Sequence, residues 1–126
     1  MKFVLSISIL FLCACKQIEG VKCLKVVNNS NKPISAAAVL RQDYLCGSFF
    51  TKVEQYSSIS NFQCQLNNNT WNSQLINYDS IILTIIDYDT FVAIPCDTIM
   101  KYNLYKKKVK LNIDSMIKNN WTITYP

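Results

Sequence analysis

Residues 80–87 read SIILTIID, and this apolar run constrains the architecture of the chain more than any other segment. It is rich in β-branched residues and too short for a typical helix, so we predict a strand buried inside a sheet. Weaker strand segments, separated by turn-forming residues, are expected at residues 22–27, 34–40, 49–53, 57–66, 91–94, 103–111 and 121–125. Together they predict a mainly β protein, a single β-sandwich of Ig-like or related topology.

Two short helical turns are expected near the C-terminus, over residues 98–102 and 115–118. Asp97 is a candidate N-cap for the first turn, and Asn112 or Asp114 for the second. Residues 43–48 are expected to form a loop. The alternative architecture is an α+β sheet with one face covered by the short helices.

The first residues have the layout of a secretory signal peptide, with Lys2 before an apolar run too short to span a bilayer comfortably. The run ends in Leu12-Cys13-Ala14-Cys15, which resembles a bacterial lipobox, whose last cysteine is acylated and begins the mature chain. We therefore predict a signal peptide at 1–14, lipidation of Cys15, a tether at 15–21 and the sandwich domain at 22–126. An ordinary secretory signal, with Cys15 left as a thiol or disulfide partner, is the alternative.

Three further segments extend this resemblance along the chain: NNSNKPI at 28–34, IIDYDTF at 85–91 and LNIDSMIKNNWTITYP at 111–126. With the lipobox, they make the chain similar to small, uncharacterised lipoproteins common in Bacteroidetes. The resemblance implies an exported, β-rich domain that a lipid anchors to a membrane of the cell envelope. It supplies no catalytic residue.

Four cysteines follow the proposed lipid acceptor: Cys23, Cys46, Cys64 and Cys96. An even number in an exported protein favours two disulfides, and unpaired buried thiols are the alternative. We expect Cys46 to pair with Cys64, closing a local excursion, and Cys23 to pair with Cys96. The spacings match no zinc ribbon or CxxC motif, and the chain has no histidine, so neither a metal nor another cofactor is expected.

The lack of histidine also removes the commonest general base. The 8 acidic residues fall mostly where turns and helix caps are expected, so a carboxylate pair is a weak enzyme hypothesis. The sequence therefore favours a non-catalytic binding or scaffolding domain. A small envelope hydrolase and an inhibitor or immunity-type protein are the alternatives.

A single concentrated basic segment contains Lys106, Lys107, Lys108 and Lys110, in a chain of formal net charge +5. Lys106 and Lys108, together with Trp71 in a polar stretch, are candidate contacts for an acidic glycan or an envelope protein. Alternatively, the lysines protect the edge of a sheet and Trp71 covers the core from a loop. Nucleic acid is not an expected partner of an exported protein.

Three Asp-Ser/Thr-aliphatic triplets, at residues 79–81, 97–99 and 114–116, resemble the O-glycosylation acceptor of exported Bacteroidetes proteins. Thr98 and Ser115 are the preferred acceptors. Ser80 opens the most apolar strand and is a poor candidate, because a bulky polar group cannot be buried there. Helix capping is the alternative role of the same triplets.

Overall fold

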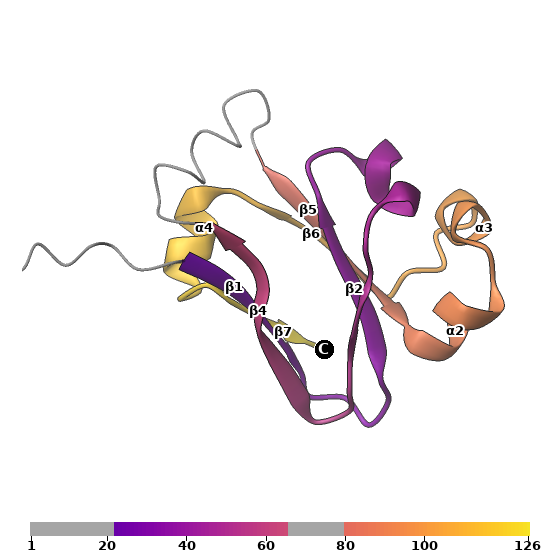
Figure 1. Cartoon of the computed structure of the whole chain (residues 1–126), viewed down its shortest axis with the longest axis horizontal. Helices are drawn as coiled ribbons and strands as arrows, with labels where there is room; N and C mark the ends of the chain where they lie inside the picture. Colours follow the sequence, from indigo (N-terminus) through magenta and orange to yellow (C-terminus); the bar gives the residue numbers. More distant parts are fainter. Residues whose placement is uncertain (1–21, 66–79) are drawn as a thin grey trace, which may run out of the picture.

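The computed structural model describes residues 22–65 and 80–126, so the predicted signal peptide, the tether and Trp71 lie outside the described residues. Two sheets pack face to face, and the predicted mainly β sandwich is confirmed (Figure 1). The smaller sheet has the order β4-β1-β7, with β4 at Ser57–Gln65, β1 at Lys22–Asn28 and β7 at Thr122–Tyr125. The larger has the order β3-β2-β5-β6, with β3 at Thr51–Val53, β2 at Ile34–Val39, β5 at Ile81–Asp87 and β6 at Lys107–Leu111.

β1 lies in the middle of the smaller sheet, antiparallel to β4 and parallel to β7. Its register with β7 runs from Lys25 opposite Thr122 to Asn28 opposite Tyr125. The register between β1 and β4 shifts between Leu24 and Val26, which indicates a bulge in β4 at this point. The first and last strands of the domain are therefore direct neighbours.

β5 lies inside the larger sheet, with β2 and β6 antiparallel on either side. Ile81, Leu83 and Ile85 belong to the main core between the two sheets. Side chains alternate between the two faces of a strand, so Ile82 and Thr84 point to the opposite face. Burial on both faces explains why the SIILTIID segment is apolar throughout instead of alternating with polar residues.

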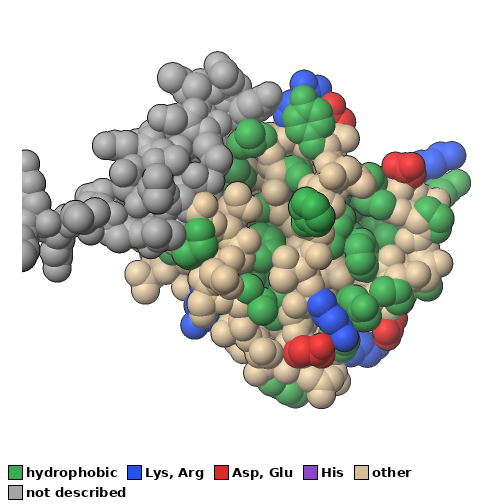
Figure 2. Space-filling view, in the orientation of Figure 1, with side chains coloured by type: hydrophobic (Ala, Val, Ile, Leu, Met, Phe, Trp, Pro, Cys, Tyr) green, Lys and Arg blue, Asp and Glu red, His purple; other side chains and the backbone are tan. Residues whose placement is uncertain are grey.

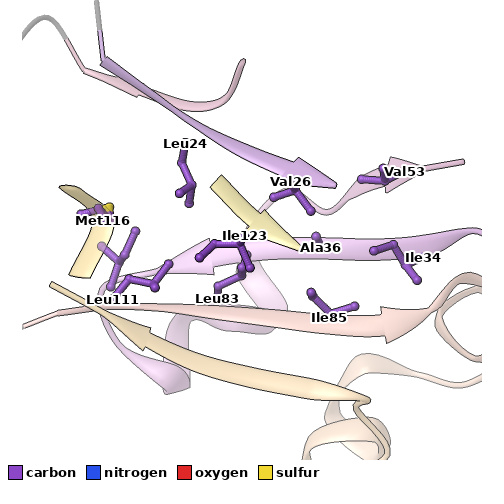
Figure 3. Packing of buried hydrophobic residues seen from close by; sticks show 11 residues of the cluster. Leu24, Val26, Ile34, Ala36, Val53, Leu83, Ile85, Leu111, Met116 and Ile123 are labelled. Carbon is purple, nitrogen blue, oxygen red and sulfur yellow. The ribbon is translucent and has the colours of Figure 1, made fainter. Parts of the chain in front are cut away.

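The main core fills the space between the sheets (Figure 3). Every strand of the two sheets except β4 contributes fully buried side chains, and α4 (Ile113–Lys118) contributes Met116. Burying one such aliphatic side chain stabilises a fold by roughly 1.5–3 kcal/mol. The buried members are Leu24, Val26, Ile34, Ala36, Val53, Ile81, Leu83, Ile85, Leu111, Met116 and Ile123.

Three short helical elements cover the outer face of the larger sheet: the 3-10 helix η1 (Gln42–Gly47), α2 (Tyr88–Ala93) and α3 (Cys96–Lys101) (Figure 1). They enclose a smaller apolar cluster of Ala37, Val39 and Leu45, with Phe50 and Met100 packed against it. The larger sheet is thus covered by a sheet on one face and by short helices on the other.

Two local predictions were wrong on this outer side. Residues 91–94 were expected to form a strand but belong mostly to α2, where the Phe91 ring packs against Phe50 instead of joining a sheet. An apolar run of four residues is too short to distinguish a strand from a helix. Residues 43–48, expected to be a loop, lie mostly in η1.

The two predicted helical turns near the C-terminus are confirmed as α3 and α4. The predicted N-cap residue was wrong for α3, and for α4 it was one of the two candidates. α3 begins earlier than expected and its N-cap is Pro95, so the prediction of Asp97 as the cap was wrong. Of the two candidate caps for α4, Asn112 is the N-cap and Asp114 lies in the first turn of the helix. Asn112 Oδ1 accepts a hydrogen bond from the Ser115 N–H at 2.8 Å, and Ser115 Oγ accepts one from the Asn112 N–H at 3.0 Å.

Asn28, at the end of β1, is fully buried and joins this strand to the β3–β4 connection. Its Nδ2 donates to the carbonyl oxygens of Lys32 at 2.8 Å, Val53 at 3.1 Å and Glu54 at 3.2 Å. Its Oδ1 accepts from the N–H of Ser30 at 3.0 Å. The predicted Asn-rich turn is therefore also a buried polar junction, which the sequence reading did not identify.

Candidate binding site

Two disulfides lie within the described residues, Cys23–Cys64 and Cys46–Cys96. The prediction that these four cysteines form two disulfides is confirmed, but the predicted pairing was wrong. Cys23 and Cys64 are directly opposite each other in the β1–β4 ladder, with Cα atoms 4.1 Å apart. Spacing along the chain does not reveal which strands are neighbours, and this neighbourhood decides the pairing.

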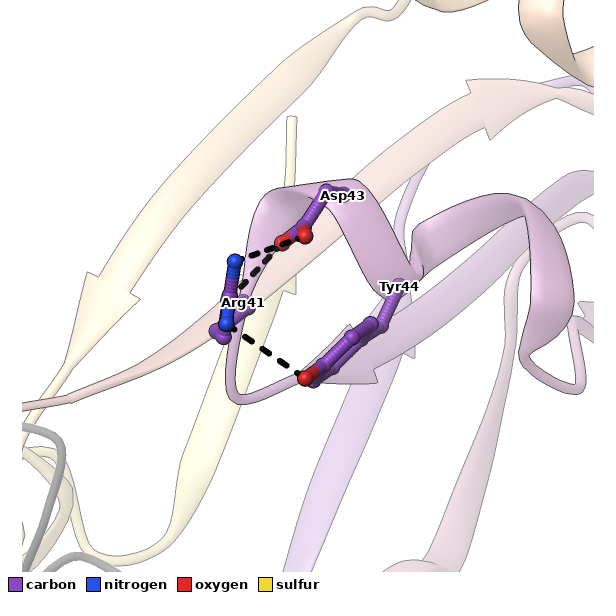
Figure 4. Close-up of polar contacts among 3 residues, drawn as sticks. All are labelled: Arg41, Asp43 and Tyr44. Carbon is purple, nitrogen blue, oxygen red and sulfur yellow. Dashed lines mark hydrogen bonds and ion pairs between the residues drawn. The ribbon is translucent and has the colours of Figure 1, made fainter.

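The second disulfide connects η1 to the first residue of α3, with the Cα atoms of Cys46 and Cys96 5.6 Å apart. At the other end of η1, the Arg41 guanidinium donates to both carboxylate oxygens of Asp43, at 3.0 and 2.8 Å (Figure 4). The same guanidinium lies 4.9 Å from the ring centre of Tyr44. The disulfide therefore ties η1 to α3, whereas the contacts of Arg41 described above stay within the exposed segment 41–44.

A hollow of about 550 Å³ lies between η1 and α2. Cys46, Ser48, Phe49 and Phe50 line one wall, and residues 91–96 line the other. The Phe50 and Phe91 rings stack with their centres 4.6 Å apart. Phe49 is 97% exposed, and hydrophobic side chains reach the surface on this side of the molecule (Figure 2).

The chemistry of this hollow suits apolar groups. Ser48 has the one hydroxyl among the lining side chains, and its Oγ already donates to the Leu45 carbonyl at 2.6 Å. No carboxylate or amine lines the hollow. The side chains that line the hollow are therefore mostly apolar, and none of them offers a group for acid–base chemistry.

No known protein family, curated protein or solved structure matches the chain. The similarity to Bacteroidetes lipoproteins therefore stays a prediction. None of the helices in the described ranges is long and apolar enough to cross a membrane.

The predicted lysine contacts both have partners within the protein. Lys106 Nζ lies 3.4 Å from a carboxylate oxygen of Asp87, and Lys108 Nζ lies 5.9 Å from the ring centre of Tyr105. Lys108 lies in β6 and Lys106 immediately before it, and β6 is an edge of the larger sheet, as the protective interpretation of the lysines expected. Trp71 lies outside the described residues, so its proposed proximity to the lysines stays a prediction.

Several carboxylates are held by nearby cations away from the hollow. Asp43 pairs with Arg41, Asp87 with Lys106, and Glu54 with Lys52 at 3.0 Å. The hydrogen bond to Glu54 raises the pKa of Lys52 above its usual value. Within residues 22–65 and 80–126, no three acidic or cysteine side chains gather in an arrangement that could hold a metal ion.

The two candidate O-glycosylation residues have different surroundings. Ser115 Oγ donates to the Asn112 carbonyl at 2.9 Å while accepting from the Asn112 N–H, so a glycan there would disturb the cap of α4. Thr98 lies half-buried in the first turn of α3. The structure therefore favours Thr98 of the two, and modification itself stays a prediction.

The aromatic side chains of the hollow were missed at the sequence level. A signal was present, because Phe49 and Phe50 are consecutive and adjacent residues of an extended segment point to opposite sides. One of the two rings therefore had to point away from the core. Both residues also follow closely after Cys46, one of the cysteines expected to form a disulfide.

Proposed function

We propose that this chain is an exported, lipid-anchored domain of the cell envelope that binds a partner protein and catalyses no reaction. The apolar hollow between η1 and α2 carries the proposal. Its Phe49 ring is 97% exposed, and water contact with a large apolar surface is unfavourable until a partner covers it. The signal peptide predicted at 1–14 supports export, as do the two disulfides, because disulfides persist in oxidising compartments.

A protein partner fits this hollow better than a glycan. Sugar hydroxyls need several hydrogen-bond donors and acceptors, but the only side-chain hydroxyl of the hollow, that of Ser48, has already donated its proton to the Leu45 carbonyl and can only accept. Aromatic and aliphatic side chains of a protein need only an apolar surface of matching shape, which Phe49, Phe91 and Val92 provide. An inhibitor or immunity-type role would be one form of this protein-binding function.

The binding part of the proposal is tested by an NMR titration of the full chain, produced with Cys15→Ala so that no lipid is added. N-acetyltryptophanamide, a probe for a protein side chain, is expected to shift the amide signals of Phe49, Phe91 and Ile94. Methyl glucoside should not shift them. Phe49→Ser should weaken the probe's binding at least about threefold, the scale of losing part of one aromatic contact.

Tyr56→Ser is the matched control, because Tyr56 is also highly exposed but lies outside the hollow. It should leave the titration unchanged. Shifts caused by the glucoside alone, or equal effects of the two variants, would contradict a protein-binding hollow.

The anchoring part is tested by membrane fractionation of cells that produce the native chain or Cys15→Ala. The native chain should sediment with membranes and carry acyl groups on Cys15 in its mass spectrum, because stable anchoring needs more than one acyl chain. The variant should be released from the membranes. A variant that remains membrane-bound, with no acyl adduct on the native chain, would refute lipid anchoring.

A further inference from the structure

β7 has an open edge on the side away from β1. The Lys25 N–H donates to the Trp121 carbonyl at 2.7 Å, and the Asn29 N–H donates to the Tyr125 carbonyl at 2.7 Å. Backbone groups in a parallel pair alternate sides from one residue to the next. Thr122 and Thr124 therefore direct backbone groups away from β1, and no further strand pairs with β7 in the described part of the chain. The Thr122 N–H already donates to the Asn119 carbonyl at 3.1 Å, so the Thr122 carbonyl and the Thr124 N–H are the groups that a new strand could pair with.

A groove of about 300 Å³ runs beside this edge, between β7 and β6. Its lining is mixed: the half-buried Val109 of β6 supplies its apolar part beside the buried Leu111 and Ile123, and the other lining residues, Lys107, Asn119, Thr122 and Thr124, are polar. At its rim, Lys107 Nζ donates to the outward-facing carbonyl of Thr124 at 3.3 Å. That contact confirms the direction of the Thr124 backbone and places an ammonium group at the open edge.

One ammonium group, that of Lys107, lines the β6 side of the groove, because Lys108 and Lys110 alternate with it along the strand and point to the opposite face. Lys107 forms no ion pair with any described residue, and none of the residues that line the groove carries a carboxylate. A second copy of this chain would therefore bring a second Lys107 to this position but no lining carboxylate to pair with it. A segment that carries carboxylates would gain attraction at the same position.

We propose that the open edge of β7 and the adjoining groove bind an extended segment of a partner protein with alternating apolar and acidic residues. The segment forms backbone hydrogen bonds with Thr122 and Thr124 and thereby extends the smaller sheet. Its apolar side chains enter the groove, and a carboxylate replaces the Thr124 carbonyl as the partner of Lys107. This surface is separate from the hollow between η1 and α2, so the proposal does not depend on the function proposed above.

The test uses two synthetic eight-residue peptides, one alternating Val and Glu and the other alternating Val and Lys, titrated into the full chain with Cys15→Ala. The Val–Glu peptide should shift the amide signals of Thr122, Thr124 and Val109, and the Val–Lys peptide should not. Lys107→Glu should weaken Val–Glu binding about fivefold or more, since it turns an attractive charge pair into a repulsive one. Lys101→Glu, the same charge change on α3, should leave the affinity unchanged.

Thr124→Pro gives a second line of evidence, because it removes an N–H of the open edge without breaking a bond to β1. It should abolish Val–Glu binding while the remaining amide spectrum stays folded. If this variant unfolds, the Lys107→Glu and Lys101→Glu comparison decides the matter alone. Equal binding of the two peptides, or shifts that avoid β7 altogether, would overturn the proposal.

Discussion

The two faces of the larger sheet are packed very differently. On the inner face, 11 buried side chains form the continuous core shared with the smaller sheet. On the outer face, the buried cluster contains Ala37, Val39 and Leu45, and Ile86 of β5 and Ile99 of α3 are also fully buried on this side. The outer side also has two buried hydroxyls, Ser35 Oγ and Thr84 Oγ1, without a hydrogen-bond partner among the described residues. The inner face therefore has the larger continuous core, whereas the outer layer is smaller and contains a disulfide that joins η1 to α3.

The strongest test of this contrast is a cavity on the inner face. Leu83→Ala should lower the free energy of unfolding by about 3–5 kcal/mol, because Leu83 is fully buried between two sheets that cannot easily collapse around a void. Urea unfolding followed by circular dichroism measures the loss. Ile82→Ala, the neighbouring residue on the outer face, should cost clearly less, and equal losses would show that the two faces contribute alike.

Removing the crosslink of the outer layer should have the next largest effect. The double variant Cys46→Ser with Cys96→Ser should lose about 2–4 kcal/mol of unfolding free energy. Amide hydrogen exchange should rise mainly in η1, α2 and α3 while β1 and β5 stay protected. The matched double variant Cys23→Ser with Cys64→Ser should instead raise exchange in β1 and β4. The same exchange pattern in both variants would argue against a separately fixed outer layer.

The smallest expected effect is a gain in stability instead of a loss. Thr84→Val replaces an unpartnered buried hydroxyl with a methyl group of similar size, so the free energy of unfolding should rise by about 1 kcal/mol. Thr51→Val on the half-buried β3 is the control and should stay within about 0.5 kcal/mol of the native chain. A clear loss of stability in Thr84→Val would show that this hydroxyl forms a hydrogen bond that matters.

The sequence revealed the elements whose signals are local. β5 was evident from its β-branched apolar run, and β6 from its alternation of lysine with apolar residues. The cap of α4 was narrowed to Asn112 or Asp114, because capping chemistry depends on residues within one turn, and the structure shows Asn112. The short apolar segment at Phe91 gave no such information, since its conformation depends on packing against Phe50.

The candidate site was harder to predict because two distant segments create it. Residues 46–50 and 91–96 are far apart in the sequence. They become neighbours through packing on the outer face of the larger sheet and through the Cys46–Cys96 disulfide. The sequence instead directed attention to the lysines, which are conspicuous because they are consecutive. In the structure, Lys106 is held by Asp87, whereas Lys107 reaches the edge of β7.

The parallel pairing of β1 with β7 has a consequence for how the chain is made. β1 is synthesised well before Trp121 and Tyr125, whose carbonyls accept hydrogen bonds from the β1 strand and the turn after it. Until residues 121–125 are made, one edge of β1 is open and Ile123 is missing from the core. Contacts between segments so far apart in the sequence also slow folding. A nascent chain that has not yet reached β7 should therefore be cleaved by proteases faster than a chain in which β7 has paired with β1.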